Sequence, residues 1–221
     1  MTLPLLLGHR GARVFRQIPE NTLASFELCL QHGCDGFEFD VRRSADGQAV
    51  IFHDATIGGM EIENTASKSL PLSTLEDVLR QFAGRAFLDI ELKVAGLEAQ
   101  TLAALRTHPP QKGYVVSSFL SDVLTVIHDL DPVIPLGFLC ETRDRLRGWR
   151  EMPAEWVIPQ FKWADGELVE LVHTAGKRIM VWTVNRAERM REFAEWGVDA
   201  IISDETELAA QVFGAPGHQA P

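Results

Sequence analysis

The sequence predicts an α/β protein built as a single (β/α)8 barrel, the TIM-barrel fold. Short apolar or β-branched runs alternate with amphipathic runs almost throughout the chain, and this rhythm is typical of repeated βα units with a parallel sheet. Eight such units can be counted in 221 residues, a length that one closed barrel occupies. Because closure removes both edges of a sheet, eight units favour a barrel over an open sheet.

The first two units are the clearest in the chain. A strand over Leu5–His9 precedes a helix over Thr22–Gln31, which Gly33 ends. A second strand over Gly36–Val41 is followed, after a turn, by an extended run over Ala49–His53. Both strands end in polar residues, so each is expected to point its carboxyl end toward the same functional face.

A short excursion is expected after the second strand. Residues Asp54–Ser73 lack clear periodicity, so they should leave the barrel before the next helix. Ser73 and Glu76 have the spacing of a capping box for that helix. The third unit then combines a strand over Ala86–Lys93 with a helix over Leu97–Arg106.

The five remaining units repeat the same order with short connections. Their expected strands and helices are, in pairs, Tyr114–Phe119 with Asp122–Asp129, Pro135–Cys140 with Arg143–Trp149, Trp156–Phe161 with Gly166–Thr174, Lys177–Asn185 with Ala187–Trp196, and Ala200–Ser203 with Glu207–Phe213. One domain should therefore span residues 1–213. Residues 214–221 combine Gly, Pro and polar side chains, so a flexible C-terminal tail is expected there.

Composition excludes some classes of partner. With 31 acidic against 21 basic residues, the formal charge of −10 would repel nucleic-acid backbones and anionic membrane surfaces. No apolar run is long enough to cross a bilayer, so stable membrane insertion is not expected either. Three cysteines without CxxC spacing predict buried free thiols and hence a reducing, cytoplasmic location. The sequence carries no signal for an oligomeric state.

Acidic residues gather where three of the predicted strands end. Glu38 and Asp40 are two positions apart, so an extended strand points both carboxylates to one face, and the same holds for Asp89 and Glu91. Such a cluster is costly inside an apolar barrel unless a cation offsets it, which predicts an oxygen-ligand site for Ca²⁺ or Mg²⁺. Glu38, Asp40 and Glu91 are the expected ligands, whereas Asp89 is expected to be a salt-bridged loop residue or a support for the ligands.

Two histidines and two cations complete the predicted site. His9 and His53 each end a strongly apolar strand, and two imidazoles beside a metal can divide proton removal and proton donation between them. Arg10 and Lys93 would add positive charge that suits an anionic substrate. For Arg10, a purely structural bridge to a neighbouring acid such as Glu20 stays open as a second interpretation.

Two further positions carry a weaker signal. Glu20 precedes the first helix, where it can complement the helix dipole while a neighbour caps the helix. Trp182 lies near the end of the seventh strand, where it can either line a pocket or belong to the core.

An ordered set of motifs resembles the glycerophosphodiester phosphodiesterase family over nearly the whole chain. The motifs are Gly8-His9-Arg10-Gly11-Ala12, Pro19-Glu20-Asn21-Thr22, Gly36-x-Glu38-x-Asp40-Val41, Asp46-Gly47, His53-Asp54, Glu91-x-Lys93, Ser118-Phe119, Val181-Trp182-Thr183-Val184-Asn185 and Ile201-Ile202-Ser203-Asp204. Each motif alone is weak, but their order and spacing together are highly specific. The resemblance implies a TIM barrel with one divalent metal that hydrolyses glycerophosphodiesters, which are small molecules, to glycerol 3-phosphate and an alcohol.

The resemblance also implies a role for each matching position. His9 and His53 look like the acid-base pair, the three carboxylates like the metal ligands, Arg10 and Lys93 like the phosphate-binding cations, Trp182 like a substrate wall, and Glu20 like a support behind the site. Which histidine is the acid, whether water or a substrate hydroxyl attacks, and which head group and metal are preferred stay open. Residues 55–72 are shorter than the insertion usual in the family, which implies a small lid.

Two other functions compete with this interpretation. One is a related barrel phospholipase that acts on lysophospholipid or phosphatidylinositol, although no amphipathic membrane segment or basic patch is evident. The other is a binding module for phosphodiesters that has kept the barrel and lost turnover. All the predicted catalytic positions are filled, which favours an enzyme.

Overall fold

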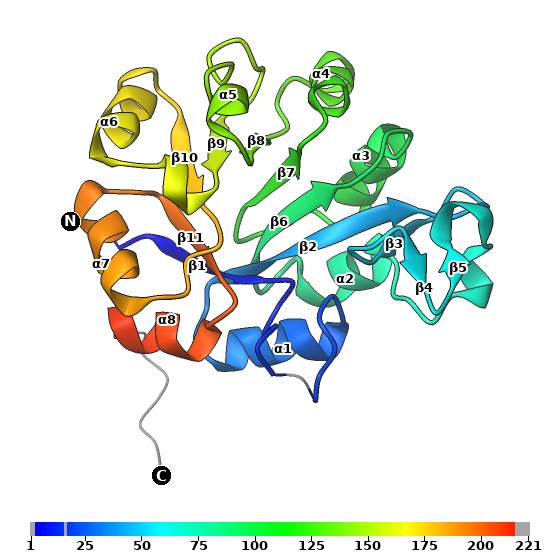
Figure 1. Cartoon of the computed structure of the whole chain (residues 1–221). Helices are drawn as coiled ribbons and strands as arrows, with labels where there is room; N and C mark the ends of the chain where they lie inside the picture. The colour runs from blue at the N-terminus through cyan, green and yellow to red at the C-terminus, as the bar shows by residue number, and fades with distance from the viewer. Residues whose placement is uncertain (1–2, 16, 215–221) are drawn as a thin grey trace.

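Eight parallel strands close into a barrel in the computed structural model, which describes residues 3–15 and 17–214 (Figure 1). The first strand pairs on one side with the last and on the other with the second, so the barrel strands leave no free edge. In order around the barrel they are β1 (Leu5–His9), β2 (Gly36–Arg43), β6 (Phe87–Leu92), β7 (Tyr114–Ser118), β8 (Leu136–Cys140), β9 (Trp156–Pro159), β10 (Arg178–Val181) and β11 (Ala200–Ser203). The predicted TIM barrel is confirmed.

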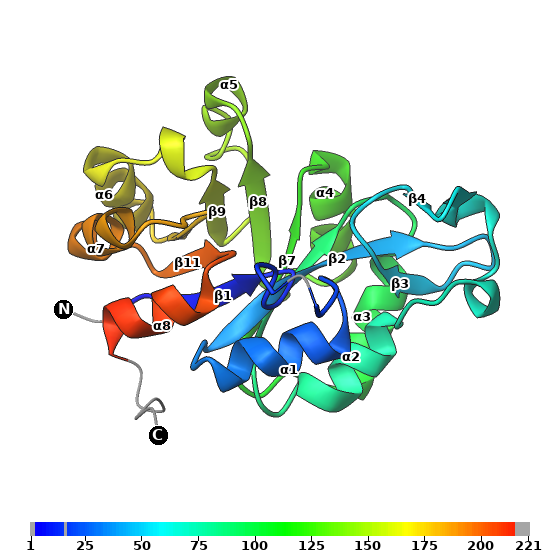
Figure 2. The ribbon, with the colours of Figure 1, turned by 60° about the horizontal axis from the view of Figure 1, so that its bottom comes forward.

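Helices surround the barrel on its outer side, as Figures 1 and 2 show. They are α1 (Leu23–Gln31), α2 (Leu75–Phe82), α3 (Glu98–Thr107), α4 (Ser121–Leu130), α5 (Arg143–Leu146), α6 (Gly166–Thr174), α7 (Ala187–Trp196) and α8 (Thr206–Phe213). No helix in the described part of the chain is both long and apolar enough to cross a membrane.

The excursion after β2 has more structure than the sequence indicated. Strand β3 (Ala49–Ile51) runs antiparallel to the end of β2, and a two-stranded hairpin follows, formed by β4 (Thr56–Ile57) and β5 (Met60–Glu61). Two 3-10 turns, Ile62–Asn64 and Ser67–Ser69, lead to α2. In Figure 2 this segment projects to one side of the barrel.

Two apolar layers hold the barrel together. Inside it, a cluster that includes Leu7, Trp156 and Met180 fills the lumen. Between strands and helices, a larger cluster includes Phe26 of α1, which stacks on Phe37 of β2 with ring centroids 4.2 Å apart. Side chains alternate along β2. Its two phenylalanines, Phe37 and Phe39, face the helices, whereas Glu38 and Asp40 face the barrel axis.

Several predicted boundaries need correction. The capping box of α2 is formed by Thr74 and Asp77, one residue later than predicted. The Thr74 hydroxyl accepts from the Asp77 backbone N–H, and the Asp77 carboxylate accepts from the Thr74 backbone N–H. The strand expected over Lys177–Asn185 is only Arg178–Val181, and the helix expected from Arg143 to Trp149 ends at Leu146. Gly197 and Gly214 end the last two helices in the left-handed conformation.

The division into a domain over residues 1–213 and a tail stays a prediction. Gly214 caps α8, and the rest of the expected tail, 215–221, lies outside the described residues.

Candidate active site

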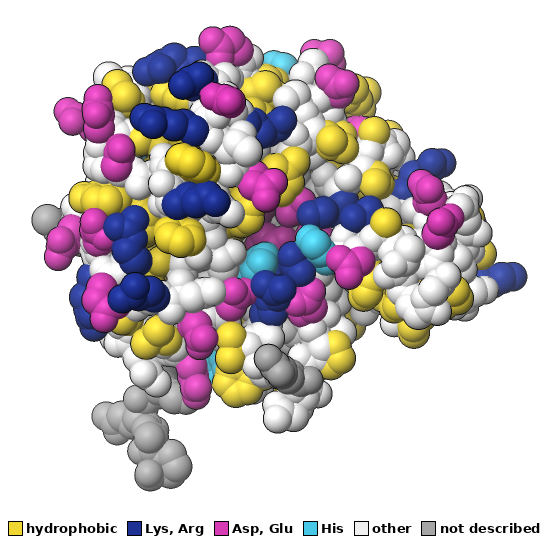
Figure 3. All heavy atoms as spheres, in the orientation of Figure 1, with side chains coloured by type: hydrophobic (Ala, Val, Ile, Leu, Met, Phe, Trp, Pro, Cys, Tyr) yellow, Lys and Arg dark blue, Asp and Glu magenta, His cyan; other side chains and the backbone are white. Residues whose placement is uncertain are grey.

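A cavity of about 310 Å³ opens at the carboxyl ends of the strands, where barrel enzymes carry their chemistry. Figure 3 shows a hollow there with acidic and histidine side chains at its centre and basic side chains beside them. Seven of the nine predicted site residues line it: His9, Arg10, Glu38, His53, Glu91, Lys93 and Trp182. Asp40 lies buried beside Glu91 and Lys93, and Glu20 lies behind Arg10.

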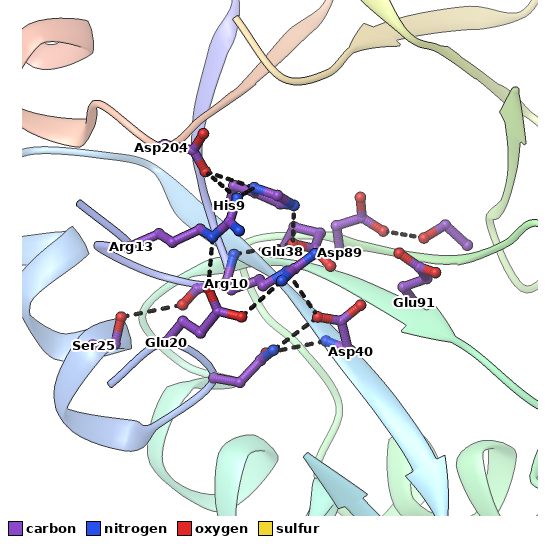
Figure 4. Close-up of polar contacts among 12 residues, drawn as sticks. His9, Arg10, Arg13, Glu20, Ser25, Glu38, Asp40, Asp89, Glu91 and Asp204 are labelled. Carbon is purple, nitrogen blue, oxygen red and sulfur yellow. Dashed lines mark hydrogen bonds and ion pairs between the residues drawn. The ribbon is translucent and has the colours of Figure 1, made fainter. Parts of the chain in front are cut away.

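Strand register brings the acidic residues together. In the barrel His9 pairs with Glu38 across β1 and β2, and Asp40 pairs with Glu91 across β2 and β6. One oxygen each from Glu38, Asp40 and Glu91 lie within 4.8 Å of one another, and all three residues are buried (Figure 4). Sequence separation alone does not show this convergence, because it depends on which strands are neighbours.

Crowding and burial shift the pKa values of the carboxylates in the cluster. Burial, followed by repulsion from Asp40 and Glu91, raises the pKa of Glu38 well above its usual range. Burial and then Asp40 raise the pKa of Glu91 to about 7. Burial also acts on Asp40, but ion pairs with Lys93 at 3.2 Å and Arg10 at 3.2 Å outweigh it and lower the pKa of that carboxyl.

The donor set fits one divalent cation. Glu38 Oε1 is buried and accepts no hydrogen bond from any described residue, and three carboxylates within reach of a common point are the hard oxygen ligands that Mg²⁺ and Ca²⁺ prefer. A cation bound between them would offset the repulsion that raises the pKa of Glu38. Glu38, Asp40 and Glu91 are therefore the residues that could hold it.

Asp89 lies beneath this cluster and corrects one expectation. It is fully buried in β6, and the only hydrogen bond of its carboxylate among the described residues is accepted by Oδ1 from the Ser117 hydroxyl at 2.6 Å. No described cation lies within ion-pair distance, so the expected salt-bridged loop residue is wrong for this position. Burial raises the pKa of Asp89 to about 7, although the Ser117 hydrogen bond acts in the opposite direction.

A tight turn after β1 places the Arg10 guanidinium. Arg10 has φ of 55° and Gly11 has φ of 81°, where a Cβ would also meet Ser25 Oγ at 2.4 Å, so only glycine fits the second position. Arg10 Nη1 donates to Glu20 Oε1 at 2.7 Å, and its backbone N–H donates to Glu38 Oε2 at 3.0 Å. The structural bridge to Glu20 is thus present, and Nη2 is left without a partner among residues 3–15 and 17–214.

Lys93 faces Arg10 across the carboxylates. Its Nζ lies 2.6 Å from Glu91 Oε1 and 3.2 Å from Asp40 Oδ1, and it also lies 5.7 Å from the ring centre of Phe119. Burial acts to lower the pKa of Lys93, but Glu91 and Asp40 outweigh it and raise that pKa. Lys93 therefore stays charged at the edge of the cavity.

A partly buried carboxylate holds His9. Asp204 Oδ1 lies 2.7 Å from His9 Nδ1, and because an ionised carboxylate can only accept, Nδ1 carries the proton and Nε2 faces the cluster, 3.9 Å from Glu38 Oε2 (Figure 4). Asp204 is itself fixed by Asn185 at 2.7 Å and by Arg13 at 3.2 Å. Burial opposes ionisation of Asp204, but His9 outweighs it and lowers the pKa of Asp204.

His53 is held in the same way but less firmly. Its Nδ1 lies 2.7 Å from Asp54 Oδ1, which leaves Nε2 as the second ring nitrogen at the cavity. The side chain of Asp54 is 70% exposed, whereas that of Asp204 is 17% exposed. Burial lowers the pKa of His53, although Asp40 and Asp54 act in the opposite direction.

The opposite side of the cavity is mostly apolar. Leu139 and Ile202 line it from β8 and β11, and Phe119 and Trp182, the residues after β7 and β10, line the rest. The Trp182 indole donates to the Ile158 carbonyl at 3.0 Å and meets the Phe119 ring edge to face, with centroids 5.6 Å apart. We call these four residues the apolar half of the barrel mouth. The charged half consists of the polar residues on the other side: His9, Arg10, Glu38, Asp40, His53, Glu91 and Lys93.

Sequence reasoning missed several residues that support the site. Asp204 holds His9 and is itself held by Asn185. Asn21 donates to Asp40 Oδ2 at 2.8 Å, and Arg13 pairs with Glu20 at 2.6 Å. Asp204 had a detectable signal, because it follows a strand end as His9 does, and the resemblance included it without a role.

The glycerophosphoryl diester phosphodiesterase family model matches residues 9–113 and 89–208. The chain belongs to this family. The predicted resemblance is therefore confirmed, and it agrees with the enzyme class predicted from the motifs.

Known members of the family cover nearly the whole chain. A glycerophosphodiester phosphodiesterase of Caldanaerobacter subterraneus is 28% identical over 92% of this chain and 95% of its own length. A phosphodiesterase of Oleispira antarctica, solved with the product sn-glycerol-3-phosphate, is 27% identical with a TM-score of 0.82 over 96% of this chain and 97% of that one. A glycerophosphodiester phosphodiesterase of Agrobacterium tumefaciens is 26% identical with a TM-score of 0.84 over 96% of this chain and all of that one.

Proposed function

We propose that this family member hydrolyses small glycerophosphodiesters to glycerol 3-phosphate and an alcohol, with one divalent cation and with His9 and His53 as its acid-base pair. The observation that carries the proposal is the convergence of two carboxylate-held histidines, three buried carboxylates and two cations on one cavity. The Oleispira relative supports the product, because its structure holds sn-glycerol-3-phosphate.

Phosphate binding falls to the charged half of the mouth. Arg10 and Lys93 offer permanent positive charge to the non-bridging oxygens of the diester. Glu38, Asp40 and Glu91 would hold the cation, which supplies Lewis-acid polarisation of the phosphoryl oxygens when bound. Arg10 is already oriented by Glu20, so little side-chain ordering remains when the phosphate binds.

Proton transfer falls to the two Nε2 atoms. One imidazole takes the proton of the attacking hydroxyl, and the other gives a proton to the departing alkoxide. The attacking hydroxyl belongs either to water, which gives glycerol 3-phosphate directly, or to the glycerol moiety, in which case water must then open the cyclic phosphate that forms. Their Nδ1 partners, Asp204 and Asp54, fix each ring with Nε2 toward the cavity. Neither carboxylate needs to change protonation, because each only orients and stabilises its histidine.

The two competing functions fit the site less well. An intact-lipid phospholipase would need a surface that binds membranes, and the formal charge of −10 repels anionic ones. A binding module would not need two histidines, each with its own oriented carboxylate. A cytoplasmic location stays a prediction from three buried free cysteines, and the absence of nucleic-acid partners stays a prediction from the charge.

The test is release of glycerol 3-phosphate by purified protein. Glycerophosphocholine, glycerophosphoethanolamine and glycerophosphoglycerol are incubated with Mg²⁺, with Ca²⁺ and with a chelator, and product is expected only with a cation. Thermal unfolding gives a second readout, because the cation should raise the Tm of the wild type but not that of Glu38→Gln. A protein that releases no glycerol 3-phosphate from any of the three with either metal contradicts the proposal.

A further inference from the structure

We propose that Glu141 selects diesters whose leaving alcohol carries a positive charge, that is, an ammonium alcohol. Glu141 follows β8 and borders the cavity next to the apolar half. It is the one acidic residue of the cavity lining that lies outside the charged half, and nothing in the proposed mechanism uses it. The inference rests on the proposed function, since it assigns the end of the same substrate.

The charge of Glu141 is uncompensated. Among the described residues, no cation lies within ion-pair distance of its carboxylate, and the residue is exposed. By contrast, Glu38 and Glu91, the other two acids that line the cavity, belong to the cluster that would hold the cation. A free carboxylate beside a site for an anionic phosphate would oppose binding unless the substrate also brings a positive group.

The position of Glu141 on the barrel sets where that positive group lies. Phosphate is bound by residues at the ends of β1, β2 and β6. Going around the barrel from β6, the next strand is β7, and β8 follows it. A diester that reaches from Lys93 toward Glu141 passes Phe119, the residue after β7, so its alcohol end lies along the apolar half.

Aromatic rings make this half suitable for an ammonium group. Phe119 and Trp182 both line the cavity, and aromatic faces attract ammonium groups, including quaternary ones. Apolar contact with methyl groups and a carboxylate at the rim together favour a substituted ammonium over a neutral polyol.

The net charge of the substrate adds to the preference. A diester with an ammonium alcohol is neutral overall, whereas one with glycerol as the alcohol keeps its negative charge. The protein carries a formal charge of −10, so the neutral zwitterion approaches the cavity with less repulsion. The long-range field and the local carboxylate therefore favour the same substrates.

The test compares kcat/KM on three diesters for the wild type and Glu141→Gln. Glycerophosphocholine and glycerophosphoethanolamine carry an ammonium alcohol, and glycerophosphoglycerol carries an uncharged alcohol. We expect Glu141→Gln to lose about fivefold in kcat/KM on both ammonium diesters and to change kcat/KM on glycerophosphoglycerol by less than about twofold. Glu170→Gln, which removes an exposed carboxylate on α6 away from the cavity, is the matched control and should change none of them.

Other outcomes separate the inference from the proposed function. An equal loss on all three diesters would mean that Glu141 binds the glycerol moiety, and unchanged kinetics would mean that it binds nothing; either result overturns the selection by charge. Glu141→Lys should reverse the preference, and 0.5 M salt should weaken the preference of the wild type. A wild type inactive on all three diesters would instead contradict the proposed function.

Discussion

The charged and apolar halves of the barrel mouth differ in how their side chains are held. On the charged half, His9, Arg10 and Asp40 are each held by a hydrogen bond to a residue of a loop at the barrel mouth. On the apolar half, Phe119 and Trp182 pack edge to face, and the Trp182 indole makes one hydrogen bond to the backbone. Directional contacts fix atoms for chemistry, whereas packing fixes a shape, so the first half should control turnover and the second half binding.

The strongest test of this division is removal of a histidine. His53→Ala should lower kcat by a factor of about 10²–10⁴, because it deletes one partner in proton transfer while leaving phosphate binding intact. Steady-state kinetics on glycerophosphocholine measure the loss, and calorimetric titration with the cation should give an unchanged Kd. His128→Ala, on the outer helix α4, is the control. Full activity in His53→Ala would remove this residue from the acid-base pair.

The buried acid beneath the site gives a test of stability instead of turnover. The folded pKa of Asp89 is raised to about 7 from 3.8, so between those values the folded state holds a proton that the unfolded state has lost, and its contribution to stability falls as the pH rises. In the presence of a chelator, the free energy of unfolding of Asp89→Asn should therefore rise relative to that of the wild type by roughly 1–4 kcal/mol between pH 4 and pH 8. Urea unfolding at several pH values measures this difference. A constant difference across that range would contradict the raised pKa.

Orientation of His9 should matter less than its presence. Asp204→Asn keeps the size of the side chain but removes the charge that holds Nδ1, so we expect kcat to fall about 10- to 100-fold with little change in KM. Asp199→Asn is a matched control, because Asp199 also pairs with a histidine, His173, at 2.9 Å but outside the cavity. A loss confined to KM would show that Asp204 shapes binding and does not position His9.

The apolar half should give the smallest effect. Trp182→Leu removes ring contact but no group that transfers protons, so KM should rise about 3- to 10-fold while kcat changes less than about twofold. Kinetics on all three diesters check this expectation. A large fall in kcat would break the division between the two halves.

The sequence predicted the charged half far better than its supports. Glu38 and Asp40 were found because strand alternation and a strand end are both local patterns. Asp204 was given no role because its partner, His9, is 195 residues away, and only closure of the barrel brings them together. Of the two roles expected for Asp89, the salt bridge was wrong for a related reason, since the burial of its carboxylate depends on the neighbouring strands β2 and β7.

The fold was predicted well at the level of units and less well at their ends. Eight alternating βα patterns specify the barrel, because each unit must bury one face against its neighbours. The capping box was predicted one residue too early. Ser73 and Thr74 both suit the N-cap position, and Glu76 and Asp77 both suit the N3 position, so tertiary contacts decide between the two pairs. The antiparallel strand β3 in the excursion was found only as an extended run.

The bond between His9 and Asp204 also sets an order in time. All three carboxylates of the cluster lie within the first 91 residues, so the ribosome adds them to the chain long before it adds Asp204. The partner of His9 arrives only after the last barrel strand, β11. Under the proposed function, orientation of His9 is thus among the last properties that a growing chain acquires, once the barrel has closed.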